Sequence, residues 1–418
     1  MLKSIPQQSW MQDANSTALM QAFSNAGVSA RFVGGCVRDA LLGRPINDVD
    51  IATDALPDEV IKLLEKVNIK TIPTGLQHGT ITALVNHQTF EITTLRHDVE
   101  TFGRHANVEF NASWEEDAAR RDFTINAMSL DFEGTLYDYF GGYEDIKAGL
   151  VRFVGNPTTR LEEDYLRLLR YFRFHAYYGQ GTPDPASLNA CVALAKNMKA
   201  LSGERIHHEI LRLFKAPKPL QTIKIMADTN IFHHLFTNPV IDLNPSDIEV
   251  FDRYLELEFQ HKLAVDGLSR MAALLKKHLD EKQARKLANR IVLSNQEKAD
   301  WLCLIKFQID ATAPMARIEN FQMMDHLGGV NFKKTLAISA AIDGQIISPD
   351  WWDYIEQKTN IPFPIQGRDI LKMGFQQGPK IGGLLKATRL WWLENGFIAN
   401  KAECLGYLDR LINDNSSN

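Results

Sequence analysis

The sequence has few of the features that mark extracellular proteins. Its 418 residues include four cysteines, which lie far apart and form no CxxC pair: Cys36, Cys191, Cys303 and Cys404. This spacing argues against a disulfide framework and against a zinc site. It favours a reducing compartment, with the cysteines used for packing.

Long hydrophobic runs and an N-terminal leader are also missing. The longest apolar stretches, such as residues 336–342, fall well short of the ~18 residues that a membrane-spanning helix needs. Residues 1–6 contain no apolar leader core, and the first arginine is Arg31, which is unlike an Arg-rich transit peptide. We therefore expect no membrane segment and a cytoplasmic location.

The chain has no excess of positive charge. It contains 46 Lys and Arg against 51 Asp and Glu, a formal net charge of −5. A basic coat for nucleic acid is thereby excluded and DNA is not an expected partner, so any contact with RNA must use local basic patches. Neither GxxxxGK[ST] nor GxGxxG occurs, which excludes P-loop and Rossmann nucleotide enzymes.

The hydrophobic pattern changes along the chain. Short β-rich runs at residues 30–33, 48–53, 80–85 and 90–95 predict an α/β or α+β region, with a helix over 57–67 and Asp54 as its possible N-cap. Beyond about residue 155, apolar residues recur every three or four positions, which predicts helices. The length is that of about three domains.

A glycine pair follows the first expected strand. If Gly34 and Gly35 open a helix, the backbone N–H groups and the positive helix end point toward an anion. Arg38, one turn later, adds a guanidinium, and together these suit a triphosphate. The alternative is an ordinary tight turn.

Carboxylates alternate with apolar residues just after this pair. On a strand, Asp48 and Asp50 point to one side while Val49 and Ile51 face the core. Their repulsion is relieved by a divalent cation, and Mg²⁺ is suited to carboxylates and phosphates. Glu91, on a neighbouring antiparallel strand, would complete a two-metal site. The alternative is a solvated polar face.

These motifs, with two others, resemble the class II tRNA nucleotidyltransferase and bacterial poly(A) polymerase family. The matching segments are residues 34–39, 48–53, 91–96 and 120–127, and the likeness is strong over 31–173, weaker at 203–209 and visible again at 367–369 and 378–382. The resemblance implies an α/β (α+β) nucleotidyltransferase head with a mixed β-sheet over 1–150. All-α neck, body and tail domains follow, over 151–215, 216–345 and 346–418.

The resemblance also implies roles for individual residues. Asp48, Asp50 and Glu91 would be catalytic, with Asp48 and Asp50 as ligands of Mg²⁺. The nucleotide would be held by Gly35, Arg38, Arg121 and Asn126, where a guanidinium suits a phosphate and an amide suits a ribose hydroxyl. The alternative for residues 120–122 is a surface charge cluster.

Residues 163–173 match the family's nucleotide-reading helix. Asp164 and Arg167 would lie about 60° apart on a helix and share a surface. Asp164 would accept a hydrogen bond from the exocyclic amine, and Arg167 would donate one to the ring nitrogen, the two groups that cytosine and adenine share. Arg170 continues this surface, whereas Arg173 lies about 180° from Asp164 and is assigned by resemblance alone. The alternative is a helix-surface ion pair.

Two further segments carry expectations. Residues 97–107 resemble a polar, mobile loop of the family that accompanies addition of the terminal A, with His105-Ala106 in place of a commoner Arg and Pro. Lys282, Lys286 and Arg290 fall on one helical face, which could follow an RNA backbone. A solvated helix face is the alternative.

Together these features predict an enzyme that adds CCA to the 3′ end of tRNA from CTP and ATP, releasing pyrophosphate by two-metal phosphoryl transfer. The alternatives are an A-adding enzyme or a poly(A) polymerase, although the latter carry a basic, aromatic stretch where this chain has residues 74–80. Three converging carboxylates argue against a non-catalytic RNA-binding homologue.

Overall fold

The protein is described from a computed structural model that defines residues 2–6, 8–102, 105–110, 112–359 and 361–416. The chain forms two compact units, Met1–Thr237 and Asn238–Asn418. The finer division into head, neck, body and tail stays a prediction. Among the described residues, no helix is long and apolar enough to cross a membrane.

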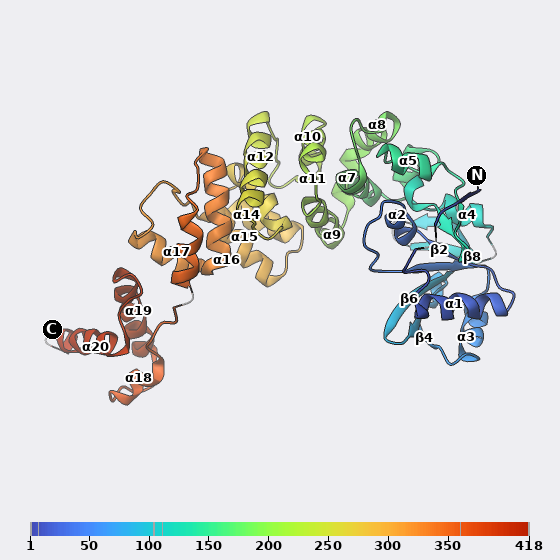
Figure 1. Cartoon of the computed structure of the whole chain (residues 1–418). Helices are drawn as coiled ribbons and strands as arrows, with labels where there is room; N and C mark the ends of the chain where they lie inside the picture. Colours follow the sequence, from blue (N-terminus) through green and yellow to red (C-terminus); the bar gives the residue numbers. More distant parts are fainter. Residues whose placement is uncertain (1, 7, 103–104, 111, 360, 417–418) are drawn as a thin grey trace. The chain divides into compact units, whose positions relative to one another are not determined.

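The first unit contains a mixed eight-stranded sheet, as predicted for the head (Figure 1). Its spatial order is β1-β10-β9-β2-β3-β6-β5-β4, in which β3 is antiparallel to β2 and parallel to β6. The strands are β1 (Leu2–Ser4), β2 (Ala30–Val33), β3 (Asp50–Thr53), β4 (Lys70–Gly75), β5 (Thr80–Val85), β6 (Gln88–Thr94), β9 (Ser129–Leu130) and β10 (Thr135–Tyr137).

Helices α1 (Ala14–Asn25), α2 (Gly35–Leu41) and α3 (Pro57–Glu65) share a core with this sheet, and α1 and α3 lie side by side (Figure 1). Strand β5 shows the underlying pattern, because Ile81, Ala83 and Val85 are buried while the residues between them are partly exposed. The N-cap of α3 is Leu56 rather than the expected Asp54, whose carboxylate instead accepts a hydrogen bond from the backbone of Ser29.

The expected polar loop at residues 97–107 is a β-hairpin. Strands β7 (Arg96–Phe102) and β8 (His105–Phe110) form a separate two-stranded sheet, pairing Arg96 with Phe110 and Phe102 with His105. Gly103 and Arg104 lie outside the described residues. The expectation of an irregular loop was wrong, because polar side chains do not prevent two adjacent segments from pairing their backbone N–H and C=O groups. The mobility of this segment and its link to addition of the terminal A remain predictions.

Helices make up the rest of the first unit. These are α4 (Trp114–Ala119), α5 (Gly142–Ala148), α6 (Pro157–Glu163), α7 (Leu166–Tyr178), α8 (Pro185–Leu194), α9 (Gly203–Phe214), α10 (Leu220–Asp228) and α11 (Ile231–Leu235), together with the 3₁₀ turn η2 (Thr124–Asn126).

The predicted continuous helix over 163–173 is interrupted. Asp164 has an extended backbone, with φ −157° and ψ 106°, and separates α6 from α7. Its side chain accepts a hydrogen bond from the backbone N–H of Leu166 at 3.1 Å, and its carbonyl accepts one from Arg167 at 3.0 Å. Asp164 is therefore the C-cap residue of α6, one residue before the N-cap Tyr165 of α7, and does not lie within a helix.

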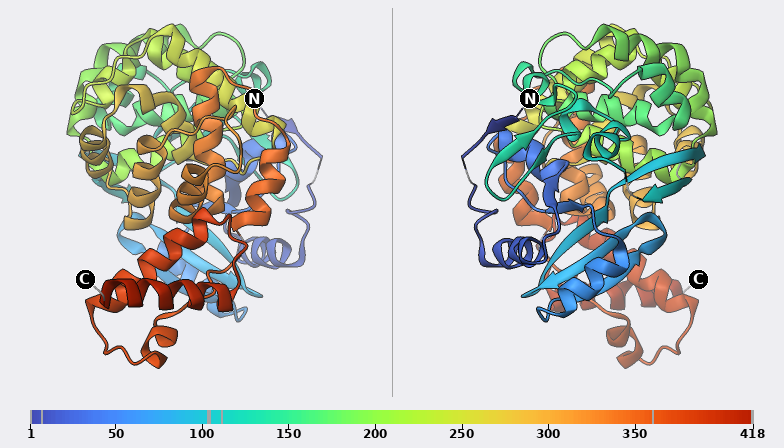
Figure 2. Two further views of the ribbon diagram at one scale, coloured as in Figure 1. Left: turned by 90° about the vertical axis from the view of Figure 1, so that its left-hand side faces the viewer. Right: turned by 90° about the vertical axis from the view of Figure 1, so that its right-hand side faces the viewer.

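The second unit is helical throughout its described length (Figure 2), as expected. It runs through α12 (Pro245–Gln260), α13 (Gly267–Leu275), α14 (Glu281–Arg290), α15 (Asn295–Lys306), α16 (Ile318–Asp343), α17 (Asp350–Thr359), α18 (Gly367–Lys372), α19 (Pro379–Glu394) and α20 (Lys401–Ser416). Trp392 is 1% exposed, and Trp391 stacks on Tyr407 with ring centroids 4.6 Å apart. Both tryptophans serve packing. All four cysteines are free thiols.

Replacement of Gly142 tests the packing under η2. A Cβ at this position would lie 2.2 Å from the carbonyl oxygen of Thr124, a backbone atom that has no rotamer by which to move away. We expect Gly142→Ala to lower the free energy of unfolding by about 1–3 kcal/mol, the usual range for overpacking. Urea denaturation measures this, with Gly382→Ala as the control because a Cβ there meets no atom within 4 Å. Parental stability of Gly142→Ala would contradict the packing described.

Candidate functional site

One cavity of about 480 Å³ in the first unit gathers most of the predicted site residues. Every predicted nucleotide-binding residue except Arg173 lines it, as does Asp50. The lining residues are Gly34, Gly35, Arg38, Asp50, Arg121, Asp122, Asn126, Asp164, Leu166, Arg167, Arg170, Phe174 and Arg205. Five arginines thus face three aspartates, which gives the cavity an excess of positive charge.

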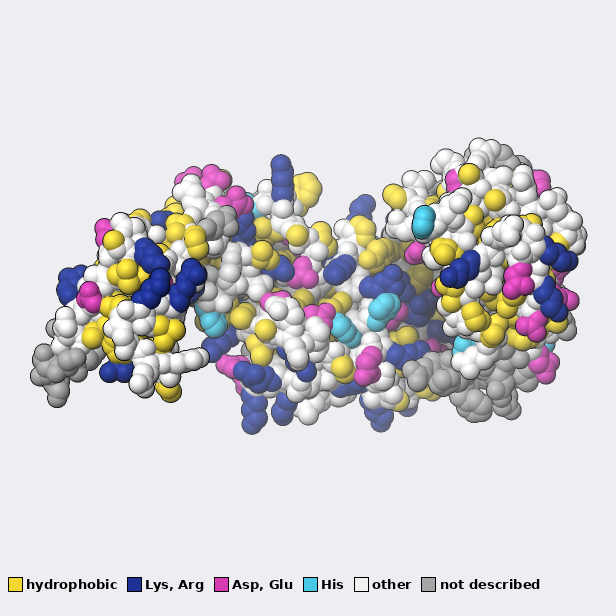
Figure 3. Space-filling model, turned by 90° about the horizontal axis from the view of Figure 1, so that it is seen from below, with side chains coloured by type: hydrophobic (Ala, Val, Ile, Leu, Met, Phe, Trp, Pro, Cys, Tyr) yellow, Lys and Arg dark blue, Asp and Glu magenta, His cyan; other side chains and the backbone are white. Residues whose placement is uncertain are grey.

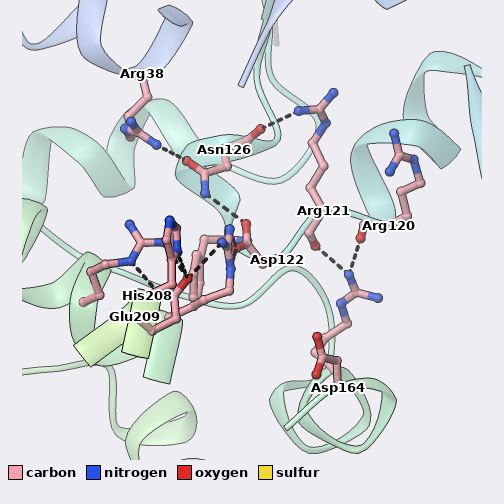
Figure 4. Close-up of polar contacts among 12 residues, drawn as sticks. Arg38, Arg120, Arg121, Asp122, Asn126, Asp164, His208 and Glu209 are labelled. Atoms are coloured by element: carbon pink, nitrogen blue, oxygen red, sulfur yellow. Dashed lines mark hydrogen bonds and ion pairs between the residues drawn. The ribbon is translucent and has the colours of Figure 1, made fainter. Parts of the chain in front are cut away.

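A chain of hydrogen bonds crosses the floor of this cavity (Figure 4). Arg38 Nη1 donates to Asn126 Oδ1 at 2.5 Å, Asn126 Nδ2 donates to Asp122 Oδ1 at 2.9 Å, and Arg170 Nε donates to Asp122 Oδ2 at 2.8 Å. Burial alone opposes ionisation of Asp122, but the charge of Arg170 and these hydrogen bonds outweigh it and hold its pKa below the usual value. A charged Asp122 therefore orients both Asn126 and Arg170.

Sequence reasoning missed Asp122 as a site residue. It stood in the segment 120–122, for which a surface charge cluster was the alternative interpretation. The structure excludes that alternative, because the side chains of Arg120, Arg121 and Asp122 are only 18%, 20% and 10% exposed. Each of them forms an ion pair, the two arginines with Asp117 of α4 and Asp122 with Arg170 of α7.

Gly34 allows Arg121 to approach the backbone. Its φ is +71°, which disfavours residues with a side chain, and an added Cβ would lie 3.0 Å from Arg121 Nη1. The same Nη1 donates to the backbone carbonyl of Asn126 at 3.4 Å. The guanidinium is therefore held against the glycine turn.

Asp50 and Glu91 are register partners on β3 and β6, but these strands run parallel and not antiparallel as expected. Asp50 lines the cavity, Glu91 is exposed, and Asp48 precedes the strand and is exposed. Burial raises the pKa of Asp50, the negative charges of Glu91 and Asp48 raise it further, and Arg121 offsets this only in part.

The local excess of negative charge at Asp50, Glu91 and Asp48 fits a divalent cation, although the cavity as a whole has an excess of positive charge. Within the described residues, however, no group of three His, Cys, Asp or Glu side chains is already gathered as a cation cage. The assignment of Asp48 and Asp50 as metal ligands therefore remains a prediction, supported by the repulsion at Asp50.

Asp164 and Arg167 both line the cavity, although they are not neighbours on one helix. Both oxygens of Asp164 accept hydrogen bonds from Arg205 of α9, Oδ1 at 3.1 Å and Oδ2 at 2.6 Å. Arg167 is paired with Glu163 and donates to the carbonyl of Arg160 at 2.8 Å. Each of the two residues is thus held by a separate partner.

Arg160 connects this segment to the neighbouring turn. It is 9% exposed, donates to the carbonyls of Arg120 and Arg121, the latter at 2.7 Å, and pairs with Glu163. The sequence offered no separate signal for its contact with this turn, since the two carbonyls lie 40 and 39 residues away along the chain.

Arg173 is not among the residues that line the cavity, and its assignment to the nucleotide remains a prediction without support from this geometry. It is 8% exposed, and its Nε donates to Glu209 Oε2 of α9 at 2.5 Å. On α7, Arg173 lies about 60° around the helix from Arg170, and the two side chains differ in their main partner, which is Glu209 for Arg173 and Asp122 for Arg170. Glu209 also lies 3.7 Å from Arg170.

The predicted RNA-binding residues lie in the second unit, on α14. Lys282 and Lys286 are exposed, and Arg290 is half-buried at the end of the helix. Ala284, Leu287 and Ala288 bury the opposite face. Lys and Arg form separate groups on the surface in Figure 3, interleaved with acidic side chains.

Comparison with known proteins gives consistent matches. Residues 30–152 match the model of the Poly A polymerase head domain, and 182–243 match the probable RNA and SrmB-binding site of polymerase A. Human mitochondrial CCA tRNA nucleotidyltransferase 1 is 35% identical over 408 residues, covering 94% of this chain and 89% of that protein. The CCA-adding enzyme of Lactobacillus johnsonii is 31% identical over 389 residues, covering 91% and 93%.

Among solved structures, the Bacillus stearothermophilus CCA-adding enzyme in complex with CTP is similar, with a TM-score of 0.76 and 27% identity. The match covers 98% of this chain and 99% of that chain.

Asp50→Asn tests the electrostatic repulsion in the cavity. Because its pKa is raised in the folded state, ionised Asp50 destabilises the fold above that pKa, and this cost disappears as the pH falls into the ordinary Asp range. With a chelator present to remove divalent cations, we expect the melting temperature of Asp50→Asn at neutral pH to lie a few degrees above that of the parent. The difference between the two melting temperatures should shrink as the pH is lowered. Scanning calorimetry measures this. A divalent cation should stabilise the parent more than the variant, and equal melting at every pH would contradict the repulsion.

Proposed function

The chain belongs to the family of CCA-adding tRNA nucleotidyltransferases, and we propose from this that it builds the CCA end of tRNA from CTP and ATP. The human and bacterial relatives match over nine-tenths of the chain or more. The observation that carries the proposal is the cavity, where the residues predicted for nucleotide binding come together beside Asp50.

The reaction is a phosphoryl transfer. The 3′-hydroxyl of tRNA attacks the α-phosphate of the nucleotide, a P–O bond forms, the bond to the bridging oxygen breaks, and pyrophosphate leaves. Enzymes of this family use a divalent metal, and we propose Mg²⁺, held by Asp48 and Asp50 with Glu91 beside them. When bound, it lowers the pKa of the attacking hydroxyl and neutralises the leaving oxygen.

The arginines of the cavity suit the triphosphate. Arg38 and Arg121 approach Asn126 from either side. The cavity has more arginines than aspartates, and this excess of positive charge favours the negatively charged triphosphate. Asn126 accepts from Arg38 and uses one N–H on Asp122. The side-chain amide of Asn126 has two N–H donors, so the second N–H can donate to a ribose hydroxyl.

Asp164 and Arg167 would read the edge of the base. Cytosine and adenine each present an exocyclic amine beside a ring-nitrogen acceptor, whereas uracil and guanine reverse this order. Asp164 Oδ2 accepts one hydrogen bond among those described, from Arg205, and so retains capacity for an amine. Arg167 would supply the donor.

The alternatives belong to the same chemistry. The head-domain model carries the name of poly(A) polymerase, yet the full-length relatives are CCA-adding enzymes. Residues 74–80 span the end of β4, η1 (Leu76–His78) and the start of β5, and lack the basic, aromatic stretch expected of a poly(A) polymerase.

Two proposals concern the rest of the molecule. Lys282, Lys286 and Arg290 would contact the tRNA backbone, since all three lie on the polar side of α14. A cytoplasmic location remains a prediction, because the human relative is named as mitochondrial.

The direct test is the 3′-end sequence of tRNA after incubation with CTP and ATP, separately and together. We expect CCA from the parent enzyme and no addition of C or A by Asp48→Ala or Asp50→Ala, with tRNA affinity unchanged, because metal binding serves the chemistry. Exposed Asp58→Ala on α3 is the matched control. Activity of the Asp50 variant within about tenfold of the parent would refute the metal assignment.

Base reading has its own test. We expect Asp164→Ala to lose on the order of 1–3 kcal/mol of discrimination against UTP and GTP, the range for one good contact to a base edge. The kcat/KM ratios of CTP to UTP and of ATP to GTP measure this. A variant that is slower but equally selective would show that Asp164 has a purely structural role.

A further inference from the structure

A fork of two hydrogen bonds holds the carboxylate of Asp164 from outside its own segment. Arg205 lies in the first turn of α9, and its Nη1 and Nη2 reach Oδ1 at 3.1 Å and Oδ2 at 2.6 Å. The two side chains are 24% and 14% exposed. Such a two-point contact fixes the plane of a carboxylate as well as its position.

This contact matters because of where Asp164 lies. Its extended backbone places it between α6 and α7. Within its own segment, the carboxylate is held only at Oδ1, by the backbone N–H of Leu166 at 3.1 Å. Selective hydrogen bonding to a base edge requires an acceptor held within about 0.5 Å and 10–20° of the productive geometry. Among the described contacts, Arg205 is the partner that meets both oxygens.

Helix α9 also contacts the arginines of α7. Glu209, one turn after Arg205, is 3% exposed, pairs with Arg173 at 2.5 Å and lies 3.7 Å from Arg170. Residues at i and i+4 occupy one side of a helix. One side of α9 therefore presents a cation to Asp164 and an anion to the arginines of α7.

We propose that Arg205 is a specificity-determining positioning residue, which sets the base selectivity of the enzyme by fixing the carboxylate of Asp164. The proposal rests on the proposed base-reading role of Asp164. Arg205 acts through Asp164 and not through a contact of its own with the base. Removal of the fork leaves Oδ1 held by the Leu166 N–H alone, so that the carboxylate can turn about that contact and accept from the wrong base edge or from water.

The experiment measures kcat/KM for CTP and UTP on a tRNA that ends at the discriminator base. The variants are Arg205→Met, which keeps an apolar stem, Arg205→Lys, which keeps the charge without the fork, Asp164→Ala, and the double variant Asp164→Ala/Arg205→Met. Arg212→Met is the matched control, because Arg212 is an exposed arginine two turns further along α9. Circular dichroism and the melting temperature verify that each variant is folded.

We expect the preference for CTP over UTP to fall about tenfold in Arg205→Met and to recover in part in Arg205→Lys. Arg212→Met should keep the parental preference. In the Asp164→Ala background, Arg205→Met should cause no further loss, because the two changes remove the same contact. If Arg205→Met does not fold, Arg205→Lys decides, since loss of the fork alone must then reduce the preference.

The outcomes separate the two ideas. A selectivity loss in Asp164→Ala, with parental selectivity in Arg205→Met and Arg205→Lys, overturns the positioning role alone. Additive losses in the double variant overturn it as well, because Arg205 would then contact the nucleotide directly. Parental selectivity in Asp164→Ala overturns the base-reading function and, with it, the inference.

Discussion

The burial of the Asp122 carboxylate constrains the whole cavity. A buried charge needs compensation by opposite charge and hydrogen bonds, and here Arg170 and Asn126 supply it. Both partners are thereby held in one orientation, and Asn126 in turn receives Arg38. One buried carboxylate thus connects α2, η2 and α7, the elements from which the nucleotide would be held.

The charges of the cavity are divided between two regions. Around Asp50, neighbouring carboxylates repel one another and leave negative charge without full compensation. Around Asn126 and α7, arginines outnumber carboxylates. A divalent cation and a triphosphate carry the complementary charges, so a metal-bound nucleotide would satisfy both regions at once. The free protein keeps this imbalance because the surrounding fold holds the side chains in place.

The segment from Arg160 to Arg173 shows how one stretch of chain can serve several purposes. Arg160 holds the backbone of the turn that carries Arg121, while Arg167 and Arg170 line the cavity. Arg173 faces Glu209 of α9 instead. The interruption at Asp164 separates Arg160 on α6 from the three arginines on α7, so Arg160 does not follow the helical spiral of the other three.

The residues by themselves determined the α/β character of the first part of the chain and the helices of the remainder. The mixed sheet and most of the cavity lining followed from the resemblance to the nucleotidyltransferase family. Strand β5 follows from alternating burial alone, and Gly35, Arg38, Arg121 and Asn126 stood in motifs distinctive enough to be assigned to a nucleotide. Such patterns are local, so a short stretch of sequence contains them.

Only the tertiary structure decided the parallel pairing of β3 with β6, the strands of the hairpin at residues 96–110 and the interruption at Asp164. It also decided that Arg173 forms an ion pair with Glu209. Likewise, it placed Arg205 against Asp164, which lies 41 residues earlier in the chain. The physical reason is that strand direction, helix ends and ion-pair partners depend on which distant groups a buried polar atom can reach. No local periodicity records that choice.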